Sequence, residues 1–145
     1  MHRHILASFL LVLPLAVQAE ALVLNDVKAQ NGIQLSADEL KQLMPSARVI
    51  NRTEAGSTRR WTNEPDGKLV ASNDGGAKAR SSKHPVSTGE GTWHIGDNGT
   101  YCVTLEWKKS SENWCRYIFK VGTKYYGVSS ATSGTAKAHE FEFSK

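Results

Sequence analysis

Alternating large apolar residues between positions 93 and 107 restrict the fold of this chain more than any other feature. All of them fall on odd positions: Trp93, Ile95, Tyr101, Val103, Leu105 and Trp107. Because successive side chains of a β-strand point to opposite faces, this pattern predicts two strands that share one apolar face. Odd residues face odd residues only across a turn of odd length. We therefore expect a three-residue turn at 97–99, with its glycine left-handed and Ile95 opposite Tyr101.

A second hairpin is predicted around Pro65-Asp-Gly67. Proline and glycine at these positions suit a type I turn that is followed by a left-handed residue. The flanking strands are expected at 60–64 and 68–72. In this register Glu64 faces Lys68, which is a favourable cross-strand pair.

A third hairpin is predicted where Gly122-Thr123 joins an aromatic strand at 113–121 to a strand at 124–128. Glycine at the first turn position suits a type II′ turn. Such a turn sets Phe119 opposite Tyr126.

One short helix is expected at Leu35–Met44. Ser36-Ala-Asp-Glu39 has the pattern of a capping box, in which the serine accepts a bond from the Glu39 amide and the glutamate reaches back. Pro45 ends the helix because it disfavours helical geometry in the residue before it. A helix of this length must dock against the rest of the chain to persist.

Three further segments complete the predicted architecture. Residues 73–90 read as a long loop and 129–138 as a low-complexity linker, while 138–144 alternate as a last strand that pairs with an early one. We expect a mainly β protein: an antiparallel meander of six to eight strands that forms a small barrel, closed or partly open, with one short N-terminal helix.

The first 19 residues have the pattern of a signal peptide: a basic start, an apolar run and small residues suited to cleavage. Residues 20–145 would then form a single β-rich domain. No later apolar run is long enough to span a bilayer, so we expect no stable membrane insertion. Periplasmic or secreted localisation follows.

The cysteines, Cys102 and Cys115, are expected to form a disulfide, because an exported chain meets an oxidising compartment. Direct cross-strand pairing places them on the face opposite Trp93, alongside Tyr117 and Phe119. The sheet would then be apolar on both faces. Either the capped helix covers one face while the other lines a barrel, or a bulge intervenes.

Aromatic residues of the predicted sheet are the candidates for ligand binding. Core packing accounts for most of them, but a groove or cavity for a small ligand would use Trp93, His94, Tyr117, Phe119 and Tyr126. We expect a non-enzymatic binding module, acting as a monomer on an unidentified small ligand or protein partner.

Two alternatives remain open. One is a secreted hydrolase that uses His94, oriented by Asp97 or Glu106, and the other is an inhibitor that inserts loop 73–90 into a partner enzyme. No metal-ligand spacing or catalytic motif is present, so we assign no catalytic residues, no metal and no cofactor. The net charge of +4 is too modest to indicate nucleic-acid binding.

Between Leu35 and Val128 the chain resembles small exported proteobacterial proteins grouped in domain-of-unknown-function families. The resemblance rests on Gly91-Thr-Trp93, Gly96-Asp-Asn-Gly99, Tyr101-Cys-Val103, Trp114-Cys115-Arg-Tyr117, Val121-Gly122 and Tyr125-Tyr126. It implies a Gram-negative periplasm and no known catalytic residues. The Gly-x-Trp element is also similar to that of lipocalin-like barrels, but there it stands in the first strand and here in mid-chain.

Overall fold

The computed structural model describes residues 21–75 and 87–145. The predicted signal peptide and residues 76–86 of the predicted loop lie outside the described residues.

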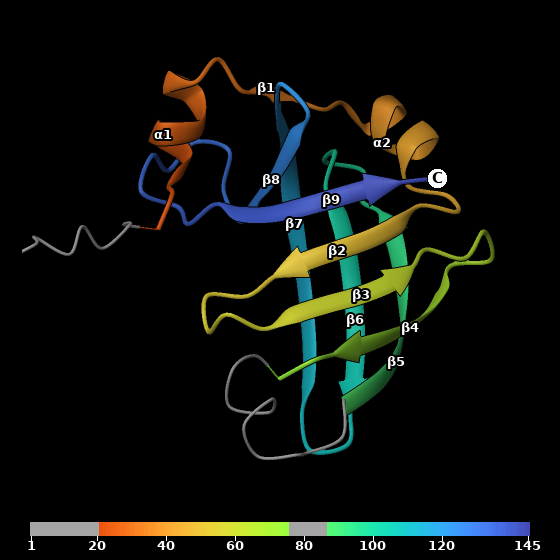
Figure 1. Cartoon of the computed structure of the whole chain (residues 1–145). Helices are drawn as coiled ribbons and strands as arrows, with labels where there is room; N and C mark the ends of the chain where they lie inside the picture. Colours follow the sequence, from red (N-terminus) through yellow and green to blue (C-terminus); the bar gives the residue numbers. More distant parts are fainter. Residues whose placement is uncertain (1–20, 76–86) are drawn as a thin grey trace, which may run out of the picture.

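Eight strands of the described residues form a closed antiparallel barrel, which confirms the mainly β meander. They are β2 (Arg48–Arg52), β3 (Thr58–Thr62), β4 (Lys68–Asn73), β5 (Ser87–Ile95), β6 (Tyr101–Trp107), β7 (Ser111–Val121), β8 (Lys124–Val128) and β9 (His139–Ser144). Each strand pairs with the next, and β9 pairs with β2, as expected for the last strand. In Figure 1, strands β9, β2, β3 and β4 cross in front of β5, β6 and β7. The space between these two layers is the barrel interior.

The β5–β6 hairpin has the predicted register, with Ile95 opposite Tyr101, and Gly99 has a φ of 76°. The predicted loop 73–90 was wrong at both ends, because Asn73 and Ser87 already pair as strand residues. The two glycines in 87–91 hide the alternation that would have indicated a strand here. Gly91 is required by close packing, since a Cβ at this position would lie 1.9 Å from the Thr104 carbonyl oxygen.

The other two predicted hairpins are also confirmed. Glu64 N donates to Lys68 O at 3.0 Å, and Gly67 has a φ of 87°. Across the β7–β8 turn Phe119 lies opposite Tyr126.

The predicted capped helix is α2 (Ala37–Leu43), and it closes one end of the barrel. Glu39 N donates to Ser36 Oγ at 3.1 Å, and Ser36 N donates to Glu39 Oε1 at 3.3 Å. Leu40 and Met44 are fully buried in the barrel core. The end of the barrel under α2 is therefore filled with apolar side chains.

A buried polar network holds α2 on the barrel. Asn63 is fully buried and its Nδ2 donates to Met44 O, at the end of the helix, at 3.1 Å. Its Oδ1 accepts from Tyr101 Oη at 2.6 Å and from Trp61 Nε1 at 3.2 Å. Burial raises the pKa of Tyr101 far above its ordinary value, so this hydroxyl stays a donor.

The expectation of a single helix was wrong, because a second helix, α1 (Leu24–Ala29), precedes α2. It has six residues and begins after Val23, so the sequence carried no side-chain N-cap to indicate it. Its amides are bound by the predicted linker 129–138: Leu24 N donates to Ala136 O at 2.8 Å and Asn25 N to Gly134 O at 2.9 Å. A two-residue strand, β1 (Ile33–Gln34), then extends the sheet beside β7.

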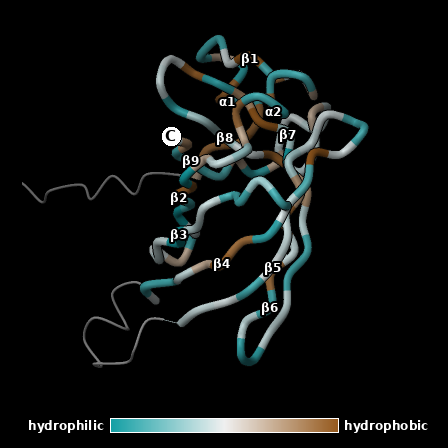
Figure 2. Tube along the Cα trace, turned by 90° about the vertical axis from the view of Figure 1, so that its right-hand side faces the viewer, coloured by the Kyte–Doolittle hydropathy of each residue, from teal (hydrophilic) through white to brown (hydrophobic). Residues whose placement is uncertain are grey.

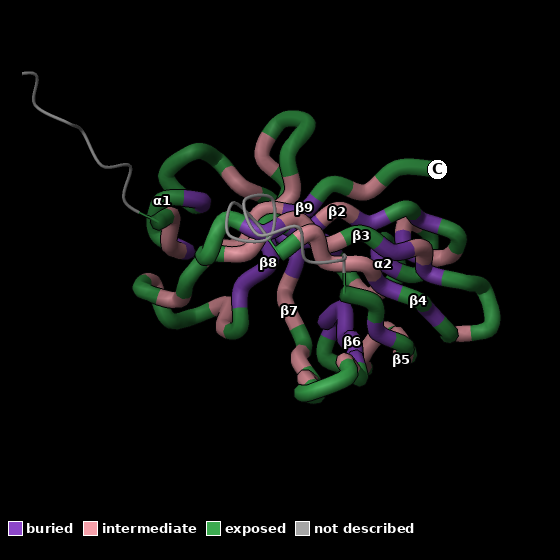
Figure 3. The backbone as a smooth tube through the Cα atoms, turned by 60° about the horizontal axis from the view of Figure 1, so that its bottom comes forward, coloured by how far each residue is buried: buried purple, intermediate pink, exposed green. Residues whose placement is uncertain are grey.

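The sheet is apolar on both faces around β7 and β8, as predicted, but α1 rather than the capped helix covers the outer face. The outer cluster consists of Leu24, Val27, Phe119, Tyr126 and Val128. The capped helix instead belongs to the inner cluster. In Figure 2 the brown, hydrophobic positions gather towards the two helices, whereas the loop joining β6 to β7 at the opposite end is hydrophilic. Figure 3 shows that the connecting loops are exposed, whereas the buried stretches lie within the strands.

Candidate functional site

The structure does not bring the five predicted ligand-binding residues together. Phe119 and Tyr126 are buried beneath α1, and Tyr117 packs against the same outer cluster. Trp93 packs on the inner cluster instead, where its Nε1 donates to Glu64 O at 2.8 Å. Trp93 and His94 border a hollow of about 350 Å³ next to Pro45 and Pro65, but Phe119 and Tyr126 lie on the covered outer face, so the five residues do not form one site.

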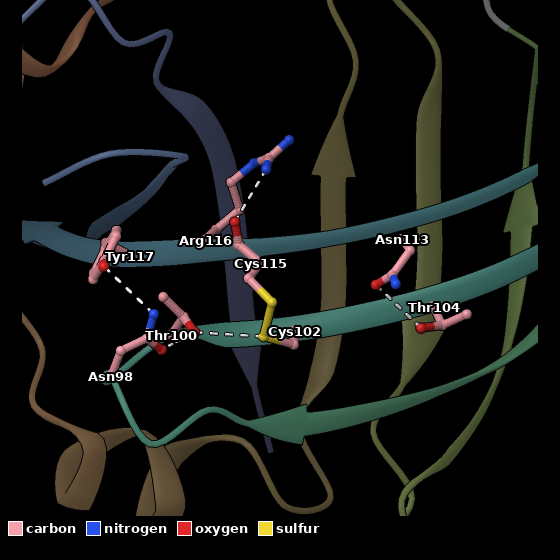
Figure 4. The surroundings of a disulfide bond; sticks show 8 residues. All are labelled: Asn98, Thr100, Cys102, Thr104, Asn113, Cys115, Arg116 and Tyr117. Carbon is pink, nitrogen blue, oxygen red and sulfur yellow. Dashed lines mark hydrogen bonds between the residues drawn. A yellow bond between two sulfur atoms is a disulfide. The ribbon is translucent and has the colours of Figure 1, made fainter. Parts of the chain in front are cut away.

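The predicted disulfide between Cys102 and Cys115 is present. The two residues lie directly opposite each other, and the bond links β6 to β7 on the outer face (Figure 4). Thr100 Oγ1 lies 3.4 Å from Cys102 Sγ. The disulfide is therefore a staple between neighbouring strands, away from the barrel interior.

His94 lies opposite Cys102 on the same outer face and is exposed. In the described part of the chain His94 forms no hydrogen bond with Asp97, and Glu106 lies opposite Glu90, further along the hairpin from His94. No carboxylate of residues 21–75 or 87–145 orients the imidazole as a general base would need. The geometry gives the predicted hydrolase no support.

The strongest candidate site is a cavity of about 410 Å³ on the side of the barrel away from α2. It lies between β2 and the β2–β3 turn, the first half of β7, and β9. Its lining residues are Asn51, Thr53, Glu54, Ala55, Arg59, Glu112, Trp114, Arg116, His139 and Phe141. Eight-stranded barrels are just wide enough either to be filled by side chains or to hold one small ligand. This barrel is filled under α2 and hollow at this site.

The sequence contained a signal for these residues that the prediction did not use. Once Cys102 faces Cys115, the even residues of β7 share the face of Val103. Glu112, Trp114 and Arg116 must then point into the barrel. The cysteine register therefore already placed two charged residues inside.

Glu112 is the centre of a charged cluster at the cavity. Its carboxylate accepts from Arg59 Nη1 at 2.7 Å, from Trp114 Nε1 at 3.0 Å and from Trp107 Nε1 at 3.2 Å. The Arg59 guanidinium also lies over the Trp107 ring, 5.3 Å from its centroid. The charges of Glu112 and Arg59 are thus mutually compensated, and both side chains are held in place.

Arg116 has no such partner. No described carboxylate forms an ion pair with its guanidinium, whose Nη1 donates to the neighbouring Cys115 O at 3.1 Å. It lies 5.4 Å from the centroid of the Trp114 ring. Burial lowers the pKa of Arg116, which Glu112 partly opposes, but a guanidinium remains charged at any physiological pH. One fixed positive charge therefore borders the cavity.

His139 lies beside this charge at the start of β9. Burial lowers the pKa of His139 below its ordinary value of 6.5, and the positive charge of Arg116 lowers it further. Glu54 raises that pKa and Lys137 lowers it, and these two residues pair with each other at 3.2 Å at the rim. At neutral pH the imidazole is held uncharged and can donate or accept a hydrogen bond.

Residues 11–115 match a family described as "Protein of unknown function (DUF995)". The chain belongs to this family. It matches no curated protein and no solved structure. The family match ends at Cys115, so in this DUF995 member Arg116, His139 and Phe141 lie beyond the matched range.

A second hollow of this DUF995 barrel, of about 470 Å³, lies beside the first, and Arg59 lines both. Its other lining residues are Asn73, Ser87, Trp107, Lys108, Lys109 and Ser110. The ion pair between Arg59 and Glu112 therefore lies at the boundary between the two cavities.

The described residues contain neither a candidate metal cluster nor a helix that could cross a membrane. No group of three or more histidine, cysteine, aspartate or glutamate side chains in 21–75 and 87–145 could hold a metal ion. No helix of the same residues is long and apolar enough to cross a membrane.

Proposed function

We propose that this protein is an exported, non-enzymatic binding protein that holds a small molecule in the cavity between β2, β7 and β9. The observation that carries the proposal is the division of the barrel interior. Under α2 the interior is packed with apolar side chains, and beyond Trp114 and Phe141 it opens into a hollow with aromatic and charged walls. Mostly apolar walls with a few fixed polar groups are typical of ligand sites.

The walls of this cavity are held rigidly before any ligand binds. Trp114 packs against Phe141 with ring centroids 6.0 Å apart and against Trp61 at 6.3 Å. Glu112 fixes the Trp114 indole through the hydrogen bond from Nε1. A preformed site loses little conformational freedom on binding, which favours affinity for a small ligand.

Export is supported by the leader pattern of residues 1–19 and by the disulfide. Protein isolated from its native host should begin after residue 19 and contain no free thiol. Mass spectrometry before and after thiol alkylation measures both. An uncleaved leader with two free thiols would contradict export.

Ligand binding is tested by nuclear magnetic resonance on ¹⁵N-labelled protein against a panel of small organic acids, amines, sugars and neutral aromatics at millimolar concentration. We expect at least one class to shift the Trp114 indole N–H resonance together with the Thr53 amide, because both residues line the cavity. A panel that moves neither resonance would contradict the proposal.

Two matched variants test whether the ligand binds in this cavity. Ala55 is exposed at the rim of the cavity, so Ala55→Trp should fill the entrance and abolish the shifts. Ala29 is exposed at the end of α1 and does not line the cavity, so Ala29→Trp should leave them unchanged. Shifts that persist in Ala55→Trp would show that the ligand binds elsewhere.

A further inference from the structure

The charges that line the cavity are two arginines and two glutamates, but they do not pair with one another one to one. Glu112 is compensated by Arg59 at 2.7 Å, and Glu54 by Lys137 at 3.2 Å. Arg116 remains, with no contact ion pair to any described carboxylate. Arg116 is therefore the charged lining residue whose charge is left without a contact ion pair among the described residues.

The Arg116 guanidinium is also held in one place. It lies over the Trp114 ring, and Nη1 donates to Cys115 O. A guanidinium has five N–H donors in a planar fork, and this single hydrogen bond leaves most of them for a ligand. The fork matches the two oxygens of a carboxylate.

The remaining walls suit an apolar body. Phe141 is buried with 2 % of its surface exposed, and its ring lies beside that of Trp114. Gly127, opposite His139 on β8, carries no side chain; a Cβ there would lie 2.6 Å from the Phe141 ring and 3.2 Å from Arg116 Cβ. The glycine lets Phe141 and Arg116 approach each other, which places an apolar surface next to the charge.

We propose that the cavity selects small organic carboxylates, with the carboxylate held by Arg116 and the apolar body lying against Trp114 and Phe141. The inference rests on the proposed function and names its ligand class. The neutral imidazole of His139 lies on the same side and supplies a further donor to the anion. The volume of about 410 Å³ is at the low end for ligand sites, so the acid is small.

The experiment compares carboxylates with their neutral amides, which have nearly the same shape. The probes are benzoate against benzamide and hexanoate against hexanamide, titrated at pH 7 with the Trp114 indole resonance as readout. In the wild-type protein each acid should bind about tenfold or more tightly than its amide, because charge-assisted hydrogen bonds are much stronger than neutral ones. Equal affinities for acid and amide would overturn the inference.

Arg116→Gln should abolish the preference for the acids and leave the affinity for the amides within a factor of about two. Arg60 is the matched control, because it is exposed on the outer face of β3 and makes no ion pair with a described residue. Arg60→Gln removes the same charge from the protein and should leave the preference intact. A preference that survives Arg116→Gln, or disappears in Arg60→Gln, would show that Arg116 is not the anchor.

A conservative variant covers the case in which Arg116→Gln is poorly folded. Arg116→Lys keeps the charge but not the planar fork, so the preference should persist at a reduced level. If the Arg116→Lys variant keeps the wild-type melting temperature but no longer prefers the acids to the amides, charge attraction alone does not explain the preference, and the planar guanidinium is required. An undiminished preference would contradict the fork and the proposed geometry.

The outcomes separate the two proposals. If the amides shift the Trp114 resonance as strongly as the acids, the cavity binds small molecules but the assignment to carboxylates is wrong. If neither acids nor amides shift it and the wider panel is also silent, the binding function itself is contradicted.

Discussion

Replacing Glu112 by glutamine tests whether the charged cluster stabilises the barrel. The carboxylate accepts three hydrogen bonds, from one guanidinium and two indoles, at 2.7, 3.0 and 3.2 Å. Glutamine keeps one acceptor oxygen, but its amide nitrogen cannot accept from an indole N–H. One bond is therefore lost, and Arg59 loses its charge partner.

The magnitude follows from these losses. A hydrogen bond to a charged group contributes about 1.5–3 kcal/mol. The Glu112 and Arg59 side chains are 24 and 20 % exposed, so solvent screens part of the electrostatic cost, and we expect a net loss of about 2 kcal/mol. For a domain of this size this corresponds to a fall in melting temperature of about 5–10 °C.

Urea unfolding followed by circular dichroism measures this change directly. The matched control is Glu106→Gln, because Glu106 is exposed on the outer face of β6 and forms no hydrogen bond with a described residue. The control should change stability by less than about 0.5 kcal/mol. If Glu112→Gln were as mild as the control, the cluster would not be a stabilising element and the fixed walls of the cavity would be in doubt.

Three further changes have defined outcomes. Gly91→Ala should lower the free energy of unfolding by about 3 kcal/mol or more, because the new Cβ meets the Thr104 carbonyl. The control is Gly56→Ala, whose new Cβ meets no atom within 4 Å; it should cost only about 1 kcal/mol, because the φ of Gly56 is 81°. Equal losses for the two variants in urea unfolding would refute the packing argument. Ser36→Ala removes the cap of α2 and should cost about 1 kcal/mol, measured in the same way; no loss would mean that packing alone holds the helix. The pKa of His139 is lower in the folded protein than in the unfolded chain, so the neutral imidazole contributes its full stability above pH 6.5, and this contribution is lost as the pH falls through the folded-state pKa. Between pH 7.5 and 5 the His139→Gln variant should therefore lose less unfolding free energy than the wild-type protein. Identical pH profiles for the two proteins would contradict this.

The hairpins could be predicted from the sequence because each depends on local chemistry. Glycine at a left-handed turn position and alternation of apolar residues fix the register of β5 with β6, and that register is the one observed. The strand at Ser87 escaped prediction for the opposite reason: glycines remove the alternation and only the neighbouring strand reveals the pairing. Helix α1 also depends on a distant segment, since Ala136 supplies the acceptor for its first amide.

The candidate site was missed because its residues come from separate strands. Arg59, Arg116 and His139 are far apart in the sequence, and no local motif links them. They meet only when β9 closes the barrel onto β2. Aromatic content attracted attention to Phe119 and Tyr126, but sequence could not tell a barrel interior from an outer face covered by an unrecognised helix.

The two halves of the barrel interior have different roles in the protein. The half beneath α2 is closed by Leu40, Met44 and the hydrogen bonds of Asn63. In the hollow half, Ala55 is exposed and Arg116 forms no ion pair with a described carboxylate, so these two lining residues can be exchanged with less damage to the scaffold than Glu112. A designer could therefore re-target this protein to new ligands by altering side chains at Ala55 and Arg116 while leaving Glu112 and the half beneath α2 untouched.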